Sequence, residues 1–145
     1  MTCSENIHSR PGPSEIDPPQ PAILDTSVVI AANVGPLPGV LAVSAVTLAE
    51  LQFGVLIARS PDVRAERLRR LSVLQRQVRA LPVDEVVATS YGRLAAAVVE
   101  AGRQPRRRVM DLLIAATAHA HQARLYTRNP DDFAGLEGHI DVVAI

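Results

Sequence analysis

The sequence predicts a single α/β domain in which a short central parallel sheet is flanked by helices. Two observations carry this prediction. Short apolar segments of strand length alternate with longer segments of helical periodicity, and turn residues separate them. Strands that alternate with helices pair in parallel, because each helix carries the chain back along the sheet. A length of 145 residues suits one domain with a core of its own.

The N-terminal segment differs in composition from the rest of the chain. Residues 1–21 are polar and contain five prolines, so we expect a disordered tail there and a folded domain over residues 22–145. No apolar segment approaches the ~20 residues of a membrane span, and no signal-peptide pattern is present. The single cysteine excludes a disulfide framework. These features predict a cytoplasmic protein that does not contact a membrane.

The first half of the domain should begin with a buried strand that ends at Asp25. The elements expected here are a strand over 22–24, a helix over 26–32, an extended segment around 41–43 and a helix from Ser44 or Thr47 to about Ala58. On the last helix Val46, Glu50, Phe53 and Ile57 recur at helical spacing, which predicts that this face turns inward.

The second half continues the alternation. The sequence Ser60–Pro61–Asp62 is typical of a helix start, and the helix it opens should bury Leu68, Leu71, Leu74 and Val78. The remaining expected elements are a strand over 81–83, a helix over 85–101 opened by Asp84, a turn over 102–108, an almost fully enclosed helix from 109 to about 121, a strand over 125–127, a turn at 129–130 and a strand over 140–144.

Charge is balanced overall but unevenly distributed. Residues 59–108 contain twelve Arg and five acidic residues, and all fifteen basic residues of the chain are Arg. Arg106, Arg107 and Arg108 form a short basic run that either contacts nucleic-acid phosphates or lies in a solvated loop. The arginine face of the helix that follows Pro61 is better explained as a solvated surface.

Three acidic residues stand alone inside strongly apolar segments: Asp25, Glu50 and Asp111. An ionised carboxylate buried without a partner is costly, so it neutralises, pairs or binds a metal. No Lys or Arg lies within these segments. Asp25 follows a strand, and ligands of open parallel sheets bind beyond the carboxyl ends of the strands. Convergence of the acids on one divalent cation would explain all three.

Each acid also has a structural interpretation. Asp25 could cap the next helix, Asp111 could interact with a helix dipole, and Glu50 could pair with an arginine. Asp131 and Asp132, in the turn-like TRNPDDF, could be ordinary first-turn acids. Taken together, however, the acids favour a hydrated Mg²⁺ or Mn²⁺ site, which is a common apparatus for hydrolysing phosphodiesters.

The motifs LDTSVVI, TLAELQFGV, MDLLIAATA and LYTRNPDDF, in this order, resemble those of PIN-domain ribonucleases, and most of all the VapC-type toxins of bacterial toxin–antitoxin pairs. The resemblance spans residues 22–145. It implies metal-dependent hydrolysis of RNA, a homodimer, and a cognate VapB-type antitoxin that blocks the acidic groove.

The resemblance also implies which residues form the site. Asp25, Glu50 and Asp111 would hold Mg²⁺ or Mn²⁺, and Thr26 or Ser27 would support the bound water or the phosphate. For the fourth ligand Asp132 matches the family pattern best, with Asn129 and Asp131 as alternatives. Arg106, Arg107 and Arg108 remain candidates for RNA contact.

The alternative function is a catalytically silent RNA- or protein-binding module on the same fold. The buried carboxylates argue against this silent module, because a site without catalytic activity would not need residues that are costly to bury. A phosphoacceptor regulator would need an acidic neighbour for Asp25 and a Lys, and the chain has neither. No Gly-rich phosphate loop is present. His119 and His121 lie two residues apart on a helix and point in different directions, so they do not predict a metal site.

Overall fold

The computed structural model describes residues 19–31 and 34–145 and contains a five-stranded parallel sheet with the strand order β3-β2-β1-β4-β5. The strands are β1 (Pro21–Leu24), β2 (Val40–Ser44), β3 (Arg79–Leu81), β4 (Arg124–Thr127) and β5 (Val142–Ala144). The predicted α/β class is confirmed. Most of the expected N-terminal tail lies outside the described residues, and Pro21 already belongs to β1.

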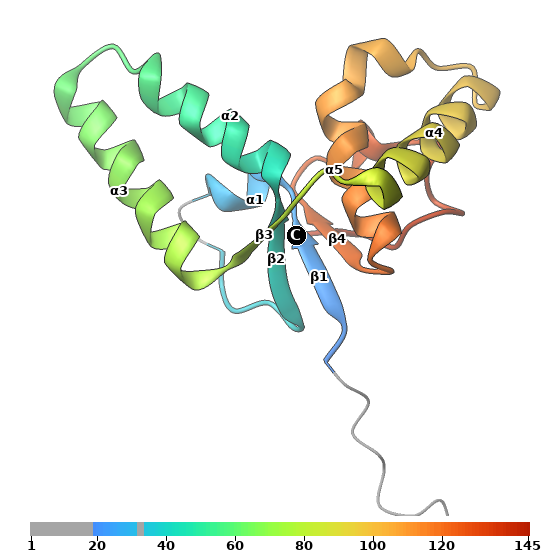
Figure 1. Ribbon diagram of the computed structural model, residues 1–145, viewed down its shortest axis with the longest axis horizontal. Coiled ribbons are helices and arrows are strands. Elements are labelled where there is room, and N and C mark those ends of the chain that lie inside the picture. The colour runs from blue at the N-terminus through green and yellow to red at the C-terminus, as the bar shows by residue number, and fades with distance from the viewer. Residues whose placement is uncertain (1–18, 32–33) are drawn as a thin grey trace, which may run out of the picture.

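Five α-helices and two 3-10 helices connect the strands within the described part of the chain. They are α1 (Thr26–Val29), α2 (Ala45–Leu56), α3 (Pro61–Gln77), α4 (Glu85–Glu100), η1 (Pro105–Arg108), α5 (Val109–Ala120) and η2 (Pro130–Phe133). Figure 1 shows the sheet in the centre, with α4 and α5 on one side of it and α1, α2 and α3 on the other. This arrangement leaves the carboxyl ends of the strands open between the two groups of helices.

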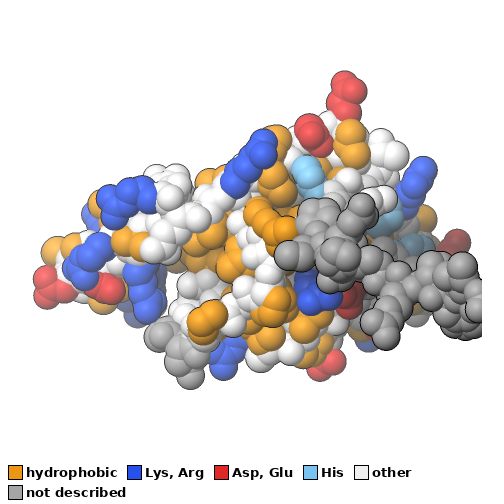
Figure 2. Space-filling model, turned by 90° about the horizontal axis from the view of Figure 1, so that it is seen from below, with side chains coloured by type: hydrophobic (Ala, Val, Ile, Leu, Met, Phe, Trp, Pro, Cys, Tyr) orange, Lys and Arg blue, Asp and Glu red, His pale blue; other side chains and the backbone are white. Residues whose placement is uncertain are grey.

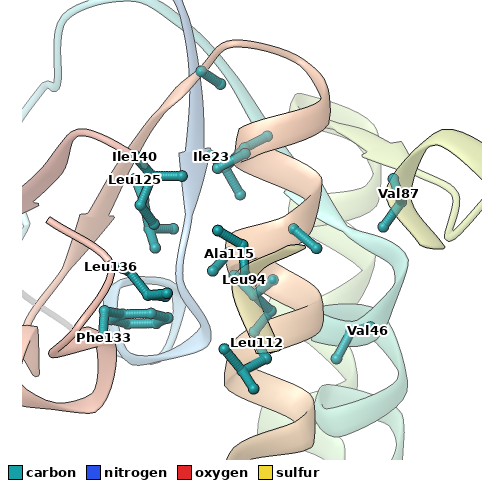
Figure 3. Packing of buried hydrophobic residues seen from close by; sticks show 14 of the residues in the cluster. Ile23, Val46, Val87, Leu94, Leu112, Ala115, Leu125, Phe133, Leu136 and Ile140 are labelled. Atoms are coloured by element: carbon teal, nitrogen blue, oxygen red, sulfur yellow. The ribbon is translucent and has the colours of Figure 1, made fainter. Parts of the chain in front are cut away.

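Each face of the sheet carries its own hydrophobic cluster, because successive side chains of a strand point to opposite faces. Ile23 and Leu125 belong to the cluster that packs against α4 and α5. In Figure 3 the side chains of this cluster surround α5, with Phe133 and Leu136 closing it from the C-terminal segment. Leu24 belongs to the second cluster, which includes apolar residues of α1 and α3. The central strands are therefore covered on both faces.

Helices α2 and α3 form an arm that extends away from the sheet (Figure 1). The start of α2 is fixed by Ser44, whose hydroxyl accepts a hydrogen bond from Val46 N at 3.1 Å. Further along, Phe53 and Ile57 are 64% and 56% exposed. The prediction that one face of this helix turns inward along its whole length is therefore wrong, because only its first turns lie over the sheet.

Several predicted boundaries also shift. Helix α1 ends at Val29, earlier than expected, and part of the predicted extension lies outside the described residues. Strand β3 ends at Leu81, because Pro82 lacks the N–H that would continue the ladder. Leu68, predicted to be buried, is 49% exposed on the arm. The predicted enclosure of α5 holds from Leu112 onward, while its first two residues are exposed.

Candidate active site

The carboxyl ends of the three central strands bring the predicted site residues to one edge of the sheet. Asp25 follows β1, Glu50 lies on the helix that directly follows β2, and Asp132 lies in η2, shortly after β4. The strand order reverses between β1 and β4, since the chain runs outward through β2 and β3 before it returns to β4. Such a switch point is where open α/β sheets bind ligands. Asp111 reaches the same region from the first turn of α5.

Asp25 is 4% exposed, and hydrogen bonds hold its carboxylate in place. Its Oδ2 accepts hydrogen bonds from the hydroxyls of Ser27 at 2.7 Å and Thr127 at 2.8 Å. Its Oδ1 accepts one from Thr26 N at 2.9 Å. The two hydroxyls are fixed in turn, because Ser27 Oγ accepts from Arg128 N and Thr127 Oγ1 accepts from Asn129 N. The capping interpretation of Asp25 is thus compatible with a place in the site.

Glu50 is oriented by threonine hydroxyls of two helices. Thr26 Oγ1 donates a hydrogen bond to Glu50 Oε1 at 2.8 Å and lies 2.9 Å from Thr47 Oγ1. Because the single hydroxyl proton of Thr26 goes to Glu50, Thr47 must donate to Thr26. Among the described residues no salt bridge joins Glu50 to an arginine, so the alternative interpretation of Glu50 as an ion-pair partner is wrong for this structure. This chain of hydroxyls aims Glu50 toward α1.

The environment of Asp111 alters the pKa of its carboxyl group. Its pKa is raised from 3.8 to about 6, chiefly by burial and then by the negative charges of Asp132, Asp25 and Glu50, while Arg108 acts in the opposite direction. The favourable dipole of the α5 N-terminus does not outweigh these effects. The charges of Asp132, Asp25 and Glu50 thus act on Asp111, so each of the three lies within electrostatic reach of it.

Of the three candidates for the fourth ligand, Asp132 is the one engaged with this cluster. It is partly buried, and its Oδ1 accepts a hydrogen bond from Arg108 Nη1 at 2.5 Å in a salt bridge. Asp131 and Asn129 are exposed, and no side-chain hydrogen bond of theirs is found among the described residues. Arg106 and Arg107 are likewise exposed, unlike Arg108.

The acids do not form a preformed metal cage. Among residues 19–31 and 34–145, no group of three or more Asp, Glu, His or Cys is arranged to hold one ion. The donor chemistry nevertheless fits a hard divalent cation, because every candidate ligand is a carboxylate oxygen. The raised pKa of Asp111 indicates excess negative charge that a cation would relieve. The roles of these residues as metal ligands remain a prediction.

Two hydroxyl residues of the site, Thr47 and Thr127, were not predicted as site residues from the sequence. Both are fully buried, although each is polar. Thr127 is the last residue of β4, and only the parallel pairing of β4 with β1 brings it to Asp25. The sequence did contain a signal for Thr127. It is a polar residue at the end of a predicted apolar strand, as Asp25 is at the end of the first strand. His119 lies outside the site, and its Nδ1 is 2.8 Å from Ser90 Oγ.

A groove of about 940 Å³ opens beside the acids, between α1, α2 and α3. Thr26 and Glu50 lie on its wall at the end nearest the site, and the residues that line the rest are mostly apolar, with Arg67, Arg69 and Arg70 of α3 among them. Figure 2 shows arginine side chains gathered on the arm formed by α2 and α3. The groove thus connects the acidic cluster with a basic and apolar surface.

Fold and site together define the class of protein. The family model of the PIN domain matches residues 22–138, so this chain belongs to the PIN-domain family. The resemblance noted in the sequence is thereby confirmed.

Comparison with individual proteins narrows the relationship. The chain is 41% identical over 133 residues to ribonuclease VapC5 of Mycobacterium tuberculosis, an alignment that covers 88% of this chain and 96% of that protein. The crystal structure of VapBC-5 from the same species, a member of the VapBC family of toxin–antitoxin systems, is similar with a TM-score of 0.76 and 38% identity over 88% of this chain and 100% of that one. FitAcB from Neisseria gonorrhoeae is similar with a TM-score of 0.66 and 27% identity over 83% and 95%.

The helices were also compared with the requirements of a membrane span. None within the described ranges is both long enough and apolar enough to cross a bilayer.

Proposed function

We propose that this chain is a metal-dependent endoribonuclease that acts as the toxin of a VapBC-type toxin–antitoxin pair. The observation that carries the proposal is the placement of Asp25, Glu50 and Asp132 near Asp111 at the switch point of the sheet, where burial and then the charges of these acids raise the pKa of Asp111 to about 6. Membership of the PIN family and the similarity to a protein named ribonuclease VapC5 support the same activity. The reaction is hydrolysis of an RNA phosphodiester by water, without a covalent enzyme intermediate.

Asp25, Glu50, Asp111 and Asp132 would hold Mg²⁺ or Mn²⁺. A bound ion of this kind supplies an acidified water molecule, orients the phosphate and neutralises charge on the leaving oxygen. The hydroxyls of Thr26, Ser27 and Thr127 keep two of these carboxylates in fixed orientations, which limits the reorganisation that binding requires.

The exposed basic residues next to the site suit the substrate. Arg106 and Arg107 precede α5 and are exposed, so they are available to contact RNA phosphates. Such contacts position a strand without reading its bases. They account for affinity for RNA, whereas the acids account for cleavage.

The partners follow from the exposed surfaces. We propose that a VapB-type antitoxin occupies the groove between α1, α2 and α3, where it would cover Glu50 together with Leu51 and Gly54 of α2. The VapBC-5 complex provides the precedent for such a partner. We also propose a homodimer, as the resemblance to VapC-type toxins implies.

The nuclease proposal is tested by incubating the purified protein with structured RNAs in the presence of Mg²⁺ or Mn²⁺. We expect cleavage by the native protein, loss of cleavage with chelator, and a decrease of at least about a hundredfold in Asp25→Asn, as for removal of a group essential to the metal site. Asp131→Asn is the matched control, because it removes an exposed acid from the neighbouring turn, and it should cleave normally.

The outcomes distinguish the competing functions. Cleavage that survives both chelation and Asp25→Asn would contradict a metal-dependent mechanism at this site. Binding of RNA without cleavage under every condition would favour the silent binding module instead. The toxin role is tested separately, because expression of the native protein should arrest growth while Asp25→Asn should not, and co-expression of the cognate antitoxin should relieve the arrest.

A further inference from the structure

Arg108 differs from the two arginines that precede it. It is the last residue of η1 and the residue before α5, so it lies one helical turn ahead of Asp111. Its guanidinium forms a salt bridge with Asp132 at 2.5 Å, and both side chains are 37% exposed. No salt bridge of Arg106 or Arg107 is found among the described residues. Arg108 is therefore directed into the acidic cluster, whereas its neighbours face solvent.

The contact has an electrostatic role in the absence of a metal. Four carboxylates at one edge of the sheet repel one another, and the positive charge of Arg108 counters part of that repulsion at both Asp132 and Asp111. In the metal-free protein the single positive charge of this guanidinium reduces the repulsion among the carboxylates. A divalent cation would reduce it further, with two charges. The same contact also uses the Asp132 carboxylate, which agrees with the lack of a preformed ligand set in the described part of the chain.

We propose that Arg108 is a displaceable counter-cation, which holds Asp132 while the site lacks a metal and gives it up when a divalent cation binds. This inference rests on the proposed metal dependence of the nuclease and adds a second state of the site to it. Arg108 is thus a positioning residue that acts through Asp132.

The exposure of the pair makes the exchange feasible. A salt bridge between side chains that are more than a third exposed is weak, because water screens it. A divalent cation with several carboxylate ligands can therefore outcompete the guanidinium. The competition nevertheless has a measurable effect, since each metal that binds must first break the contact between Arg108 and Asp132.

The test measures Mn²⁺ binding without RNA, by titration calorimetry or by paramagnetic resonance of the free ion. Arg108→Gln should bind Mn²⁺ about three- to fivefold more tightly than the native protein, as expected for loss of one competing exposed ion pair. Arg107→Gln is the matched control, because it removes the same charge from the neighbouring position, and its affinity should stay close to native. Arg108→Lys keeps the charge and should also remain close to native.

The opposite result would overturn the inference. If Arg108→Gln binds Mn²⁺ equally well or more weakly, Arg108 does not compete for Asp132 and instead helps to present it. If the native protein binds no Mn²⁺ in any condition, the proposed metal site fails and the displacement fails with it.

A metal-free measurement separates these two failures. In the presence of chelator, Arg108→Gln should have a lower melting temperature than the native protein. The same substitution should not lower the melting temperature of Asp132→Asn. A double-mutant cycle of this kind isolates the energy of the pair. Coupling between Arg108 and Asp132 without any Mn²⁺ binding would identify a purely structural ion pair. Equal effects of Arg108→Gln in both backgrounds would contradict the pairing itself.

Discussion

At the scale of single residues, the site is organised by hydroxyl groups as much as by carboxylates. Ser27 and Thr127 both donate to one oxygen of Asp25, and Thr26 donates to Glu50. Asp111 is the exception, because no hydrogen bond or salt bridge to its carboxylate is found among the described residues, and its environment raises its pKa. Its side chain is partly buried, so water screens its charge less than that of an exposed carboxylate. Asp111 is thus the residue at which the metal-free protein is most strained electrostatically.

The raised pKa of Asp111 makes the stability of the metal-free protein depend on pH. The folded chain binds this proton more readily than the unfolded chain does, since the pKa increases from 3.8 to about 6. The resulting stability is fully present below pH ~4 and is lost as the pH rises through ~6. Asp111→Asn removes this loss, so in chelator its free energy of unfolding should match the native value near pH 4 and exceed it by about 1 to 2 kcal/mol at pH 7, once solvent screening is allowed for.

Denaturant unfolding at the two pH values measures this difference. Asp62→Asn is the control, because Asp62 also lies in the first turn of a helix but outside the acidic cluster, and it should give no comparable gain. A clear loss of stability in Asp111→Asn at pH 7 would mean that Asp111 acts as a structural cap of α5.

At the scale of elements, the sequence predicted the parts that depend on local chemistry. Asp84 accepts a hydrogen bond from Val87 N at 3.0 Å and begins α4 where its position implied. Asp25, Glu50 and Asp111 were found because each breaks an apolar segment, whereas Asp132 was chosen from its match to the family pattern. The exposure of Phe53 and Ile57 was not predictable in this way, because helical spacing shows which side chains share a face but not how far the sheet extends beneath it. The Arg108–Asp132 pair joins segments 24 positions apart and leaves no local pattern.

Helix α4 of the core and helix α3 of the arm should respond differently to loss of their N-caps. Asp84→Ala removes the cap of α4, which packs against α5 in the core, so it should lower the global free energy of unfolding by about 1 kcal/mol. Ser60 caps α3 on the exposed arm, where its hydroxyl accepts a hydrogen bond from Val63 N at 3.2 Å, and Ser60→Ala removes this cap. It should change the global value less and instead increase amide hydrogen exchange in the first turn of α3.

Denaturant titration and hydrogen exchange on both variants distinguish these effects. Equal global losses would mean that the arm unfolds together with the sheet. Helix α3 would then be part of the cooperative core.

At the scale of the whole molecule, the proposed metal site would join the two halves of the chain. Asp25 and Glu50 come from the first half, and Asp111 and Asp132 come from the second. A ligand shared between them binds only the folded chain, so it stabilises the entire domain by mass action. This link between metal binding and global stability gives a measure of the site that is independent of RNA cleavage.

Mn²⁺ should therefore raise the melting temperature of the native protein. At a free concentration a hundredfold above the dissociation constant, the added stability is about 2.7 kcal/mol. The double variant Asp25→Asn/Asp111→Asn lacks a ligand from each half and should show little increase in a thermal scan with and without Mn²⁺. An increase as large as that of the native protein would place the bound ion elsewhere on the surface.

The central position of β1 has a consequence for the synthesis of this protein. β1 leaves the ribosome first but must wait for β4, and the hydrogen bond from Thr127 to Asp25 joins residues 102 positions apart. Closing such a long loop is slow compared with forming local structure. Until β4 has emerged, Asp25 lacks the hydrogen bond from Thr127, although the nearby Ser27 can already donate to it, and η2 has not formed. A chain that has not yet formed β4 and η2 therefore lacks both the Thr127 contact of Asp25 and the segment that carries Asp132.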